Sequence, residues 1–232
     1  MATFPASIVG FGKAIFRPSN IPAAMALIVI LAGSGFADYL NRSVQVERLR
    51  GEVLAQASGI RAKLEGNING NLQLVRGLVA MVETEPDMTQ ERFSALVRNL
   101  VERDSPIRNI AAAPDLVVRM VYPVERNRGV IGLDYTLKPN QREAAVRARD
   151  TGELVFAGPV DLVQGGQAFI GRFPVFIEAG EGESKFWGLL SVVIDLERLY
   201  RDSGLLDETL GLDISITGRD GLGAEGDRFY GS

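Results

Sequence analysis

The sequence predicts an α+β protein in which a long helical segment leads into an antiparallel sheet. Apolar residues recur every three or four positions between residues 42 and 85, which indicates one long helix. Short runs rich in β-branched and aromatic residues then alternate with Gly and Pro turns, as antiparallel strands do. One amphipathic helix, Gln141–Arg149, lies among these runs, and helices placed before and within a set of hairpins are typical of α+β domains.

The composition excludes several classes of function. The 232 residues contain no Cys and no His, which removes thiolate metal sites, the usual metal ligand and the usual general base. The net charge is −4 and no basic run is present, so we expect no nucleic-acid partner. Glu181 and Glu183 lack further oxygen ligands and are interpreted as a solvated loop. We therefore expect no metal, no cofactor and no enzymatic activity in this chain.

The N-terminal region predicts a membrane anchor. Residues 20–40 form the expected transmembrane helix, because the stretch from Ile21 to Ala37 is uncharged and approaches the ~20 residues that cross a bilayer. Residues 1–19 are basic and contain no acid, which predicts a cytoplasmic N-terminal tail. The bulk would then lie in the periplasm, anchored by a single pass in the inner membrane. A cleaved signal peptide ending near Ala32–Ser34 is the alternative.

Residues 41–85 are predicted to form a stalk helix that ends before Pro86. Its apolar stripe needs a partner, which is either the chain's own domain or the same helix of a second subunit. We expect a homodimer formed through this stalk. The stripe consists of Val46, Leu49, Val53, Ala57, Ile60, Leu64, Ile68, Leu72, Val75, Val79 and Val82.

After the stalk, a second helix is expected to start at Thr89, an N-cap residue. The runs Ile110–Ala113 and Leu116–Tyr122, split by Pro114-Asp115, predict a hairpin. The segment 130–135 is expected to be a short strand or a loop.

The second part of the sheet surrounds the helix Gln141–Arg149, which we expect Gly152 to end. A strand at Leu154–Phe156 is predicted to stop at Gly158-Pro159, and a tight turn at Gly165-Gly166 to form the next hairpin. Phe186–Ile194 is the most apolar run, which predicts a central strand, and an amphipathic helix follows at Asp195–Tyr200.

The tail predicts the start of a further module. Leu212–Ile216 alternates apolar and polar residues and is predicted to be one strand, which is too little for a stable domain. We therefore expect residues 204–232 to be a truncated second module that continues beyond this sequence, after a first module at residues 86–203.

An ordered set of short motifs resembles the CHASE domain, an extracytoplasmic sensor of bacterial histidine kinases, of diguanylate cyclases and phosphodiesterases, and of plant cytokinin receptors. The similarity covers roughly residues 86–232 and rests on Arg142-Glu143, Arg147-Ala-Arg149, Thr151-Gly152, Gly158-Pro159, Leu162-Val163, Phe173–Phe176, Gly188, Asp195–Leu199, Leu212–Ile216 and Phe229–Ser232.

The resemblance implies a stalk helix, a membrane-distal PAS-like subdomain that holds a small ligand and a membrane-proximal one. It also implies dimerisation through the stalk and an output enzyme beyond a second membrane helix, outside this sequence. The ligand-binding residues it suggests are Asp134, Tyr135, Gln141, Arg142, Ala157, Val163, Arg172 and Phe173.

Two departures from the plant pattern bear on the ligand. Gln141 stands where the plant receptors have an Asp, and it offers a donor and an acceptor but no charge. Arg172 replaces a small hydroxyl residue, and in a pocket it would favour a carboxylate or phosphate. Alternatively Arg172 faces solvent, one residue out of phase with Phe173. Asp134 is either a ligand anchor or the cap of a turn.

Two functions from different classes therefore remain open. One is a membrane-anchored receptor that senses a small molecule in a PAS-like pocket. The other is a structural dimerisation or protein-docking module without a small ligand. A pocket filled by aromatic rings would favour the second, and the candidate rings are Phe156, Phe169, Phe173 and Phe176.

Overall fold

The structure is a computed structural model that describes residues 21–101, 104–162, 165–180 and 182–231. It forms two compact units, Met1–Ala55 and Gln56–Ser232. The predicted cytoplasmic tail, residues 1–19, lies outside the described residues.

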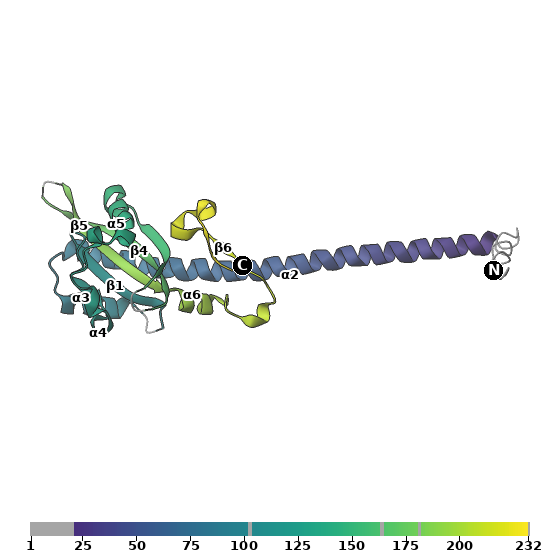
Figure 1. The fold of residues 1–232 in the computed structure, drawn as a ribbon, viewed down its shortest axis with the longest axis horizontal. Coiled ribbons are helices and arrows are strands. Elements are labelled where there is room, and N and C mark those ends of the chain that lie inside the picture. Colours follow the sequence, from purple (N-terminus) through teal and green to yellow (C-terminus); the bar gives the residue numbers. More distant parts are fainter. Residues whose placement is uncertain (1–20, 102–103, 163–164, 181, 232) are drawn as a thin grey trace, which may run out of the picture. The chain divides into compact units, whose positions relative to one another are not determined.

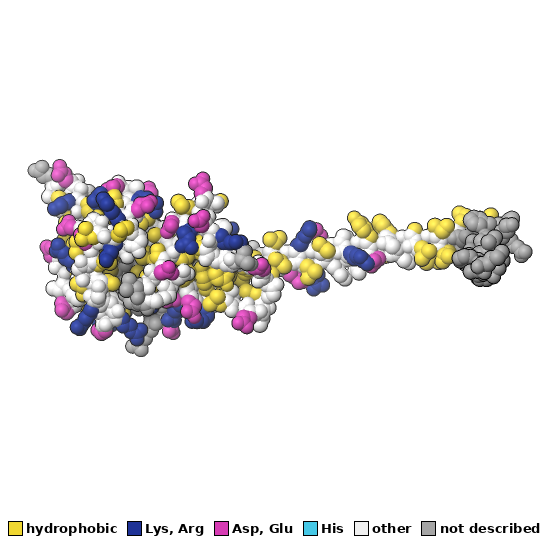
Figure 2. Space-filling view, viewed as in Figure 1, with side chains coloured by type: hydrophobic (Ala, Val, Ile, Leu, Met, Phe, Trp, Pro, Cys, Tyr) yellow, Lys and Arg dark blue, Asp and Glu magenta, His cyan; other side chains and the backbone are white. Residues whose placement is uncertain are grey.

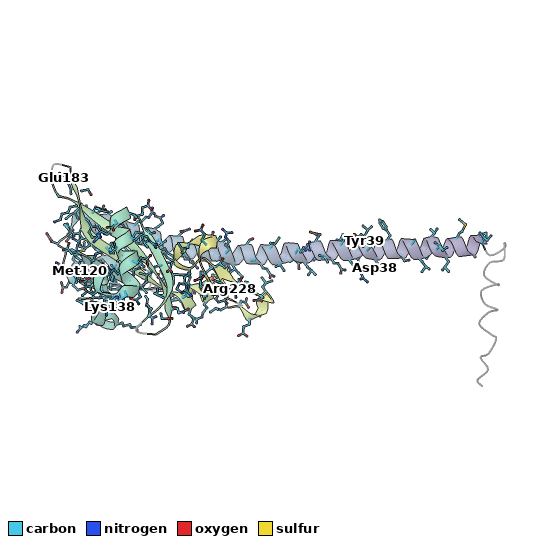
Figure 3. All side chains as sticks on the ribbon, turned by 45° about the horizontal axis from the view of Figure 1, so that its top comes forward. Asp38, Tyr39, Met120, Lys138, Glu183 and Arg228 are labelled. Carbon is cyan, nitrogen blue, oxygen red and sulfur yellow. The ribbon has the colours of Figure 1, made fainter. Side chains whose placement is uncertain are left out.

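The described part of the first unit is helical and belongs to α2 (Ile21–Thr84). This helix is long and apolar enough to cross a membrane, judged by length and composition. Figure 2 shows apolar side chains exposed along it, and Tyr39 projects from it in Figure 3. The large apolar residues concerned include Met25, Leu27, Ile28, Val29, Ile30, Leu31, Phe36 and Leu40.

The polar part of α2 carries exposed ion pairs between successive turns, such as Arg42–Asp38 at 3.0 Å and Arg48–Glu52 at 3.1 Å. Each such pair stabilises a helix by only a few tenths of a kcal/mol. The helix ends at Thr84, immediately before a turn that contains Pro86, as the sequence predicts.

The second unit contains a five-stranded antiparallel sheet with the strand order β2-β1-β5-β4-β3, of which β1, β4 and β5 are labelled in Figure 1. The apolar run 186–194 lies in β5, and its predicted central position is confirmed. The strands are β1 (Ile107–Pro114), β2 (Met120–Tyr122), β3 (Val155–Asp161), β4 (Gln167–Glu178) and β5 (Ser184–Asp195).

One face of the sheet packs against helices from both ends of the domain. The C-terminal part of α2, α3 (Gln90–Leu100) and α6 (Leu196–Ser203) contribute to one large apolar cluster with this face. Thr89 caps α3 by accepting a hydrogen bond from the amide of Arg92 at 3.3 Å. The members from the strands include Ile110, Ala112, Phe169, Phe173, Val175, Leu190, Val192 and Ile194.

The opposite face of the sheet is covered by α5 (Pro139–Thr151), together with the short 3-10 turn η3 (Tyr135–Leu137). The predicted helix Gln141–Arg149 lies within α5, and Gly152 ends it at φ 67°, a conformation that favours glycine. Both faces of the sheet are therefore buried, so a polar side chain on either face is enclosed by the domain.

Two predictions about strand limits are wrong. β3 does not stop at Gly158-Pro159 but continues to Asp161, with a shift of register between Ala157 and Val160. An edge strand tolerates proline at such an irregularity. The amide of Gly158 donates instead to Asp220 Oδ1 at 2.7 Å.

The alternation in Leu212–Ile216 does not make a five-residue strand. Only Ile216–Thr217 (β6) pairs, with Arg228–Tyr230 (β7). Ile214 and Ile216 pack against the large apolar cluster, so their period of two reflects contact with the core rather than a ladder. The remainder of the predicted hairpins is confirmed: β1 pairs with β2, and β3 with β4.

Candidate ligand-binding site

The site lies on the sheet face that α5 covers, and Arg172 is at its centre. Arg172 of β4 is paired with Val155 of β3 and with Ser191 of β5. Paired residues in a sheet point to the same side, so these three side chains share one face. Only 2% of Arg172 is exposed. Of the two orientations that the sequence allows, the buried one holds.

The helix α5 presents small residues to this face. Gln141, Ala144, Ala145 and Ala148 follow the spacing that places residues on one side of a helix, and Ala145 and Ala148 are fully buried. Short side chains let the helix lie close to the sheet. Gln141, in the first turns, is the polar member of this row, and its Oε1 lies 3.5 Å from Arg172 Nη2.

Tyr135 closes the site next to the first turn of α5. Its ring centre lies 5.6 Å from the Cζ atom of Arg172, and its hydroxyl donates to Ser191 Oγ at 3.1 Å. Burial raises the pKa of Tyr135, so its hydroxyl remains a neutral hydrogen-bonding group. The ring is held in place because η3 is capped by the preceding Asp134.

The guanidinium of Arg172 is not satisfied by these neighbours. Its Nε and Nη1 atoms are buried and have no hydrogen-bond partner among the described residues, and the Nη2 contact with Gln141 is at the limit of a hydrogen bond. Burial lowers the pKa of Arg172, and the nearby charge of Arg147 lowers it further, while Tyr135 acts in the opposite direction. Arginine nevertheless keeps its charge at neutral pH. Within the described residues, no carboxylate forms an ion pair with Arg172.

The other predicted site residues take different positions. Ala157 is buried and pairs with Ile170, which places it on the same face as Arg172. Asp134 caps its turn by accepting from the Thr136 amide at 2.8 Å and hydroxyl at 2.6 Å, as the capping alternative predicts. Val163 lies outside the described residues.

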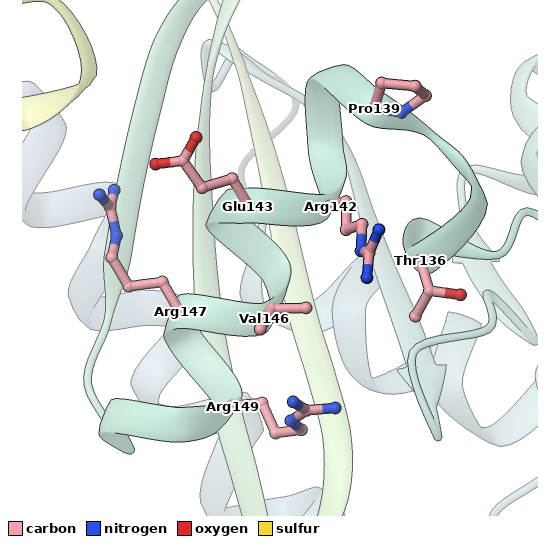
Figure 4. Close-up of a pocket in the computed structure, with 7 residues that line it drawn as sticks. All are labelled: Thr136, Pro139, Arg142, Glu143, Val146, Arg147 and Arg149. Carbon is pink, nitrogen blue, oxygen red and sulfur yellow. The ribbon is translucent and has the colours of Figure 1, made fainter.

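Two predicted residues face away from Arg172. Phe173, the next residue in β4, belongs to the apolar cluster on the α2 face, because successive residues of a strand point to opposite sides. Arg142 is exposed and lines an open groove of about 660 Å³ with Thr136, Pro139, Glu143, Val146, Arg147 and Arg149. In Figure 4, Arg142 and Arg149 project from one side of α5, and Glu143 and Arg147 from the other.

Three of the four candidate rings lie on the sheet face opposite to Arg172. Phe156, Phe169 and Phe173 all pack in the cluster on the α2 face of the sheet. Phe176 makes an edge contact with Phe186 at 5.7 Å between ring centres. A pocket filled by all four rings would have favoured a docking module without a ligand, and the four rings do not form such a filling.

Ser191 is the residue that the sequence analysis missed. It is 2% exposed and lies in the centre of the sheet. A usable sign was present, because Ser191 is the only hydroxyl within the apolar run Phe186–Ile194. Glu183, by contrast, is exposed at the tip of the β4–β5 hairpin (Figure 3), and the described residues contain no cluster of acids suited to a metal.

A family model described as the CHASE domain matches residues 72–230, which is more than half of the chain. The chain belongs to the CHASE domain family. The match runs from the last turns of α2 to the end of β7, and so includes every described residue of the site. The resemblance noted in the sequence is confirmed, and no curated protein matches the chain.

The fold of this CHASE domain resembles that of solved structures. An extracellular ligand binding receptor from Desulfohalobium retbaense DSM5692 superposes with a TM-score of 0.57 and 16% identity over 70% of this chain and 28% of that one. The resemblance at this identity concerns the fold, which is a helix and antiparallel sheet arrangement of the PAS-like sensor type.

Two further structures are more distant. The ligand binding domain of the amino acid chemoreceptor PctC of Pseudomonas aeruginosa PAO1, in complex with GABA, has a TM-score of 0.43 and 19% identity over 66% of each chain. The histidine kinase DctB sensor domain of V. cholerae has a TM-score of 0.43 and 12% identity over 66% of this chain and 60% of that one. The chain therefore spans less than two thirds of each of the three structures.

Proposed function

We propose that this chain is the extracytoplasmic ligand-sensing region of a membrane-anchored signalling receptor. The ligand would be a small molecule held between the sheet and α5, around Arg172, Gln141, Tyr135, Ser191 and Ala157. Membership of a sensor family supports the class of function. The apolar N-terminal part of α2 supports the anchor. An inner-membrane location with the N-terminus in the cytoplasm remains our prediction.

One observation carries the proposal of a ligand. Arg172 is 2% exposed, yet its Nε and Nη1 atoms have no hydrogen-bond partner in the part of the chain that the structure describes. Withdrawing a charged group from water without a counter-ion costs several kcal/mol. A core selected only for stability would have an apolar residue here, whereas a binding site requires a preformed donor. The unpartnered donors are thus best explained as one half of an interaction that a ligand completes.

Signalling would pass through the stalk. Stripe residues such as Val46, Leu49 and Val53 are exposed in the structure. This exposure supports our proposal that they pack against the same helix of a second subunit. A ligand that binds one arrangement of the paired helices better than another would bias an output domain beyond this sequence.

Binding can be tested on the full chain in lipid nanodiscs. Trp187, the single tryptophan, is buried in β5 and reports unfolding of the sheet. A library of small acids, amino acids and purines should contain a compound that raises the melting temperature in a saturable way. The shift should vanish in Arg172→Met and persist in Arg142→Met, a matched change of an exposed arginine on α5. If no class of compound shifts the melting temperature, or if the shift is equal in the two variants, the proposal is wrong.

A further inference from the structure

The charges around Arg172 restrict the ligand. Its guanidinium is a permanent cation with two donor atoms that lack a partner among the described residues, and its hydrogen bond and its ring contact are with neutral groups, the Gln141 amide and the Tyr135 ring. Arg147 adds a second positive charge close enough to act on Arg172. A ligand that neutralises these positive charges must therefore be an anion.

The shape of the donor group restricts the anion further. A guanidinium is a planar fork whose parallel N–H bonds match the two oxygens of a carboxylate. The Cζ atom of this group lies 5.6 Å from the centre of the Tyr135 ring, and the Tyr135 hydroxyl already donates to Ser191 Oγ. The apolar cluster of this face contains four buried alanines, Ala111, Ala113, Ala145 and Ala148, together with larger residues such as Val155 and Leu189. Such a site suits a compact molecule with one carboxylate.

The site also lacks what an amino group would need. Asp134 is the acid next to Tyr135 in sequence, but its Oδ1 accepts two hydrogen bonds from Thr136. Glu143 lines the open groove along α5 together with Arg147, but only Arg147 of these two acts on Arg172. No other acid of the described segments acts on Arg172. An ammonium group bound here would be buried beside two arginines without a counter-ion, which strongly disfavours it.

We infer that the ligand is a small carboxylate without an ammonium group, held by Arg172 between β4 and α5. This inference rests on the proposed function and makes it more specific. The CHASE domain would thus discriminate a simple organic acid from the amino acid of the same skeleton.

Matched ligand pairs test the inference on the full chain in nanodiscs. The pairs are acetate and glycine, propionate and β-alanine, butyrate and 4-aminobutyrate, and succinate and aspartate. Propionamide, inorganic phosphate and adenine complete the set. Affinity is measured by calorimetry and by the melting temperature followed at Trp187. At least one acid should bind, its amino partner at least tenfold more weakly, and Arg172→Met should abolish that binding.

The apo form of Arg172→Met provides an independent check of the role of this residue. Removing a buried cation without a counter-ion should leave the melting temperature equal to or above that of the wild type, whereas a merely structural arginine would lower it. Arg172→Lys keeps the charge without the fork and should weaken acid binding at least tenfold.

The outcomes separate the inference from the proposal beneath it. Amino acids that bind as well as their simple acids, or phosphate or adenine as the only binders, would overturn the inference and leave a ligand sensor. If no compound of this set binds and no compound of the library shifts the melting temperature, both the inference and the proposed function are wrong.

Discussion

The Cζ atom of Arg172 lies 5.6 Å from the centre of the Tyr135 ring, although the two residues come from a strand and a 3-10 turn on separate layers of the domain. A cation over an aromatic ring gains about 1–2 kcal/mol when it is removed from water. That gain falls short of the several kcal/mol that burial of the charge costs. This deficit supports our proposal that a ligand completes the contacts of Arg172.

The Tyr135 hydroxyl should contribute measurably to stability. Tyr135→Phe keeps the ring over Arg172 but leaves the buried Ser191 hydroxyl without its donor, so we expect a loss of about 1–2 kcal/mol. Urea unfolding followed by Trp187 fluorescence measures this loss. Tyr200→Phe is the matched control, because the Tyr200 hydroxyl is buried without a partner. Its removal should be neutral or stabilising, and equal losses in both variants would contradict the assignment.

Two glycines should respond in opposite ways to alanine. A Cβ atom at Gly188 would overlap the backbone of Ala113 and Pro114 in the neighbouring strand β1, so Gly188→Ala should destabilise the domain by about 2–3 kcal/mol or more. Gly66 lies in α2 with nothing near its would-be Cβ, so Gly66→Ala should stabilise it by up to about 1 kcal/mol. Chemical denaturation of both variants is the measurement. A tolerated Gly188→Ala would contradict the register of β1 and β5.

Asp134 should make stability depend on acid pH. Hydrogen bonds from the Thr136 hydroxyl and amide hold the pKa of Asp134 below its usual value of 3.8. A lowered native pKa favours folding above the unfolded value, and this contribution disappears as the pH falls through the native pKa. Asp134→Asn should therefore lower stability at pH 7 and converge with the wild type over the acid range in which the native carboxylate takes up its proton. The measurement is the urea midpoint of unfolding of both proteins at pH values across this range. A constant difference between the two midpoints at every pH would contradict the role of Asp134.

The stalk should cross-link at its apolar stripe. The chain contains no cysteine, so Val53→Cys introduces a single thiol at an exposed stripe position. We expect covalent dimers on mild oxidation of the full chain in nanodiscs. Ala55→Cys lies about 160° away around the helix, at two residues' distance, and serves as the control. Preferential cross-linking at residue 55, or none at either position, would argue against pairing through this stripe.

Local chemistry was sufficient to predict many elements. Gly152 marks the end of α5 because its φ of 67° favours glycine, and Thr89 marks the start of α3 because its hydroxyl accepts from the Arg92 amide. The run 186–194 is apolar because β5 has a neighbour on each side and helices on both faces. The strand through Gly158-Pro159 was missed because a register shift absorbs the proline.

The sequence by itself determined that Arg172 and Phe173 face opposite sides of one strand, since successive side chains of a strand always do. It did not determine which of the two lies among polar groups, because helices bury both sides of this sheet and no polar face marks the solvent. Only the tertiary structure decided this, by placing Gln141, Tyr135 and Ser191 around Arg172. Tyr135 and Ser191 are 56 residues apart, and chain folding alone brings their hydroxyls within 3.1 Å.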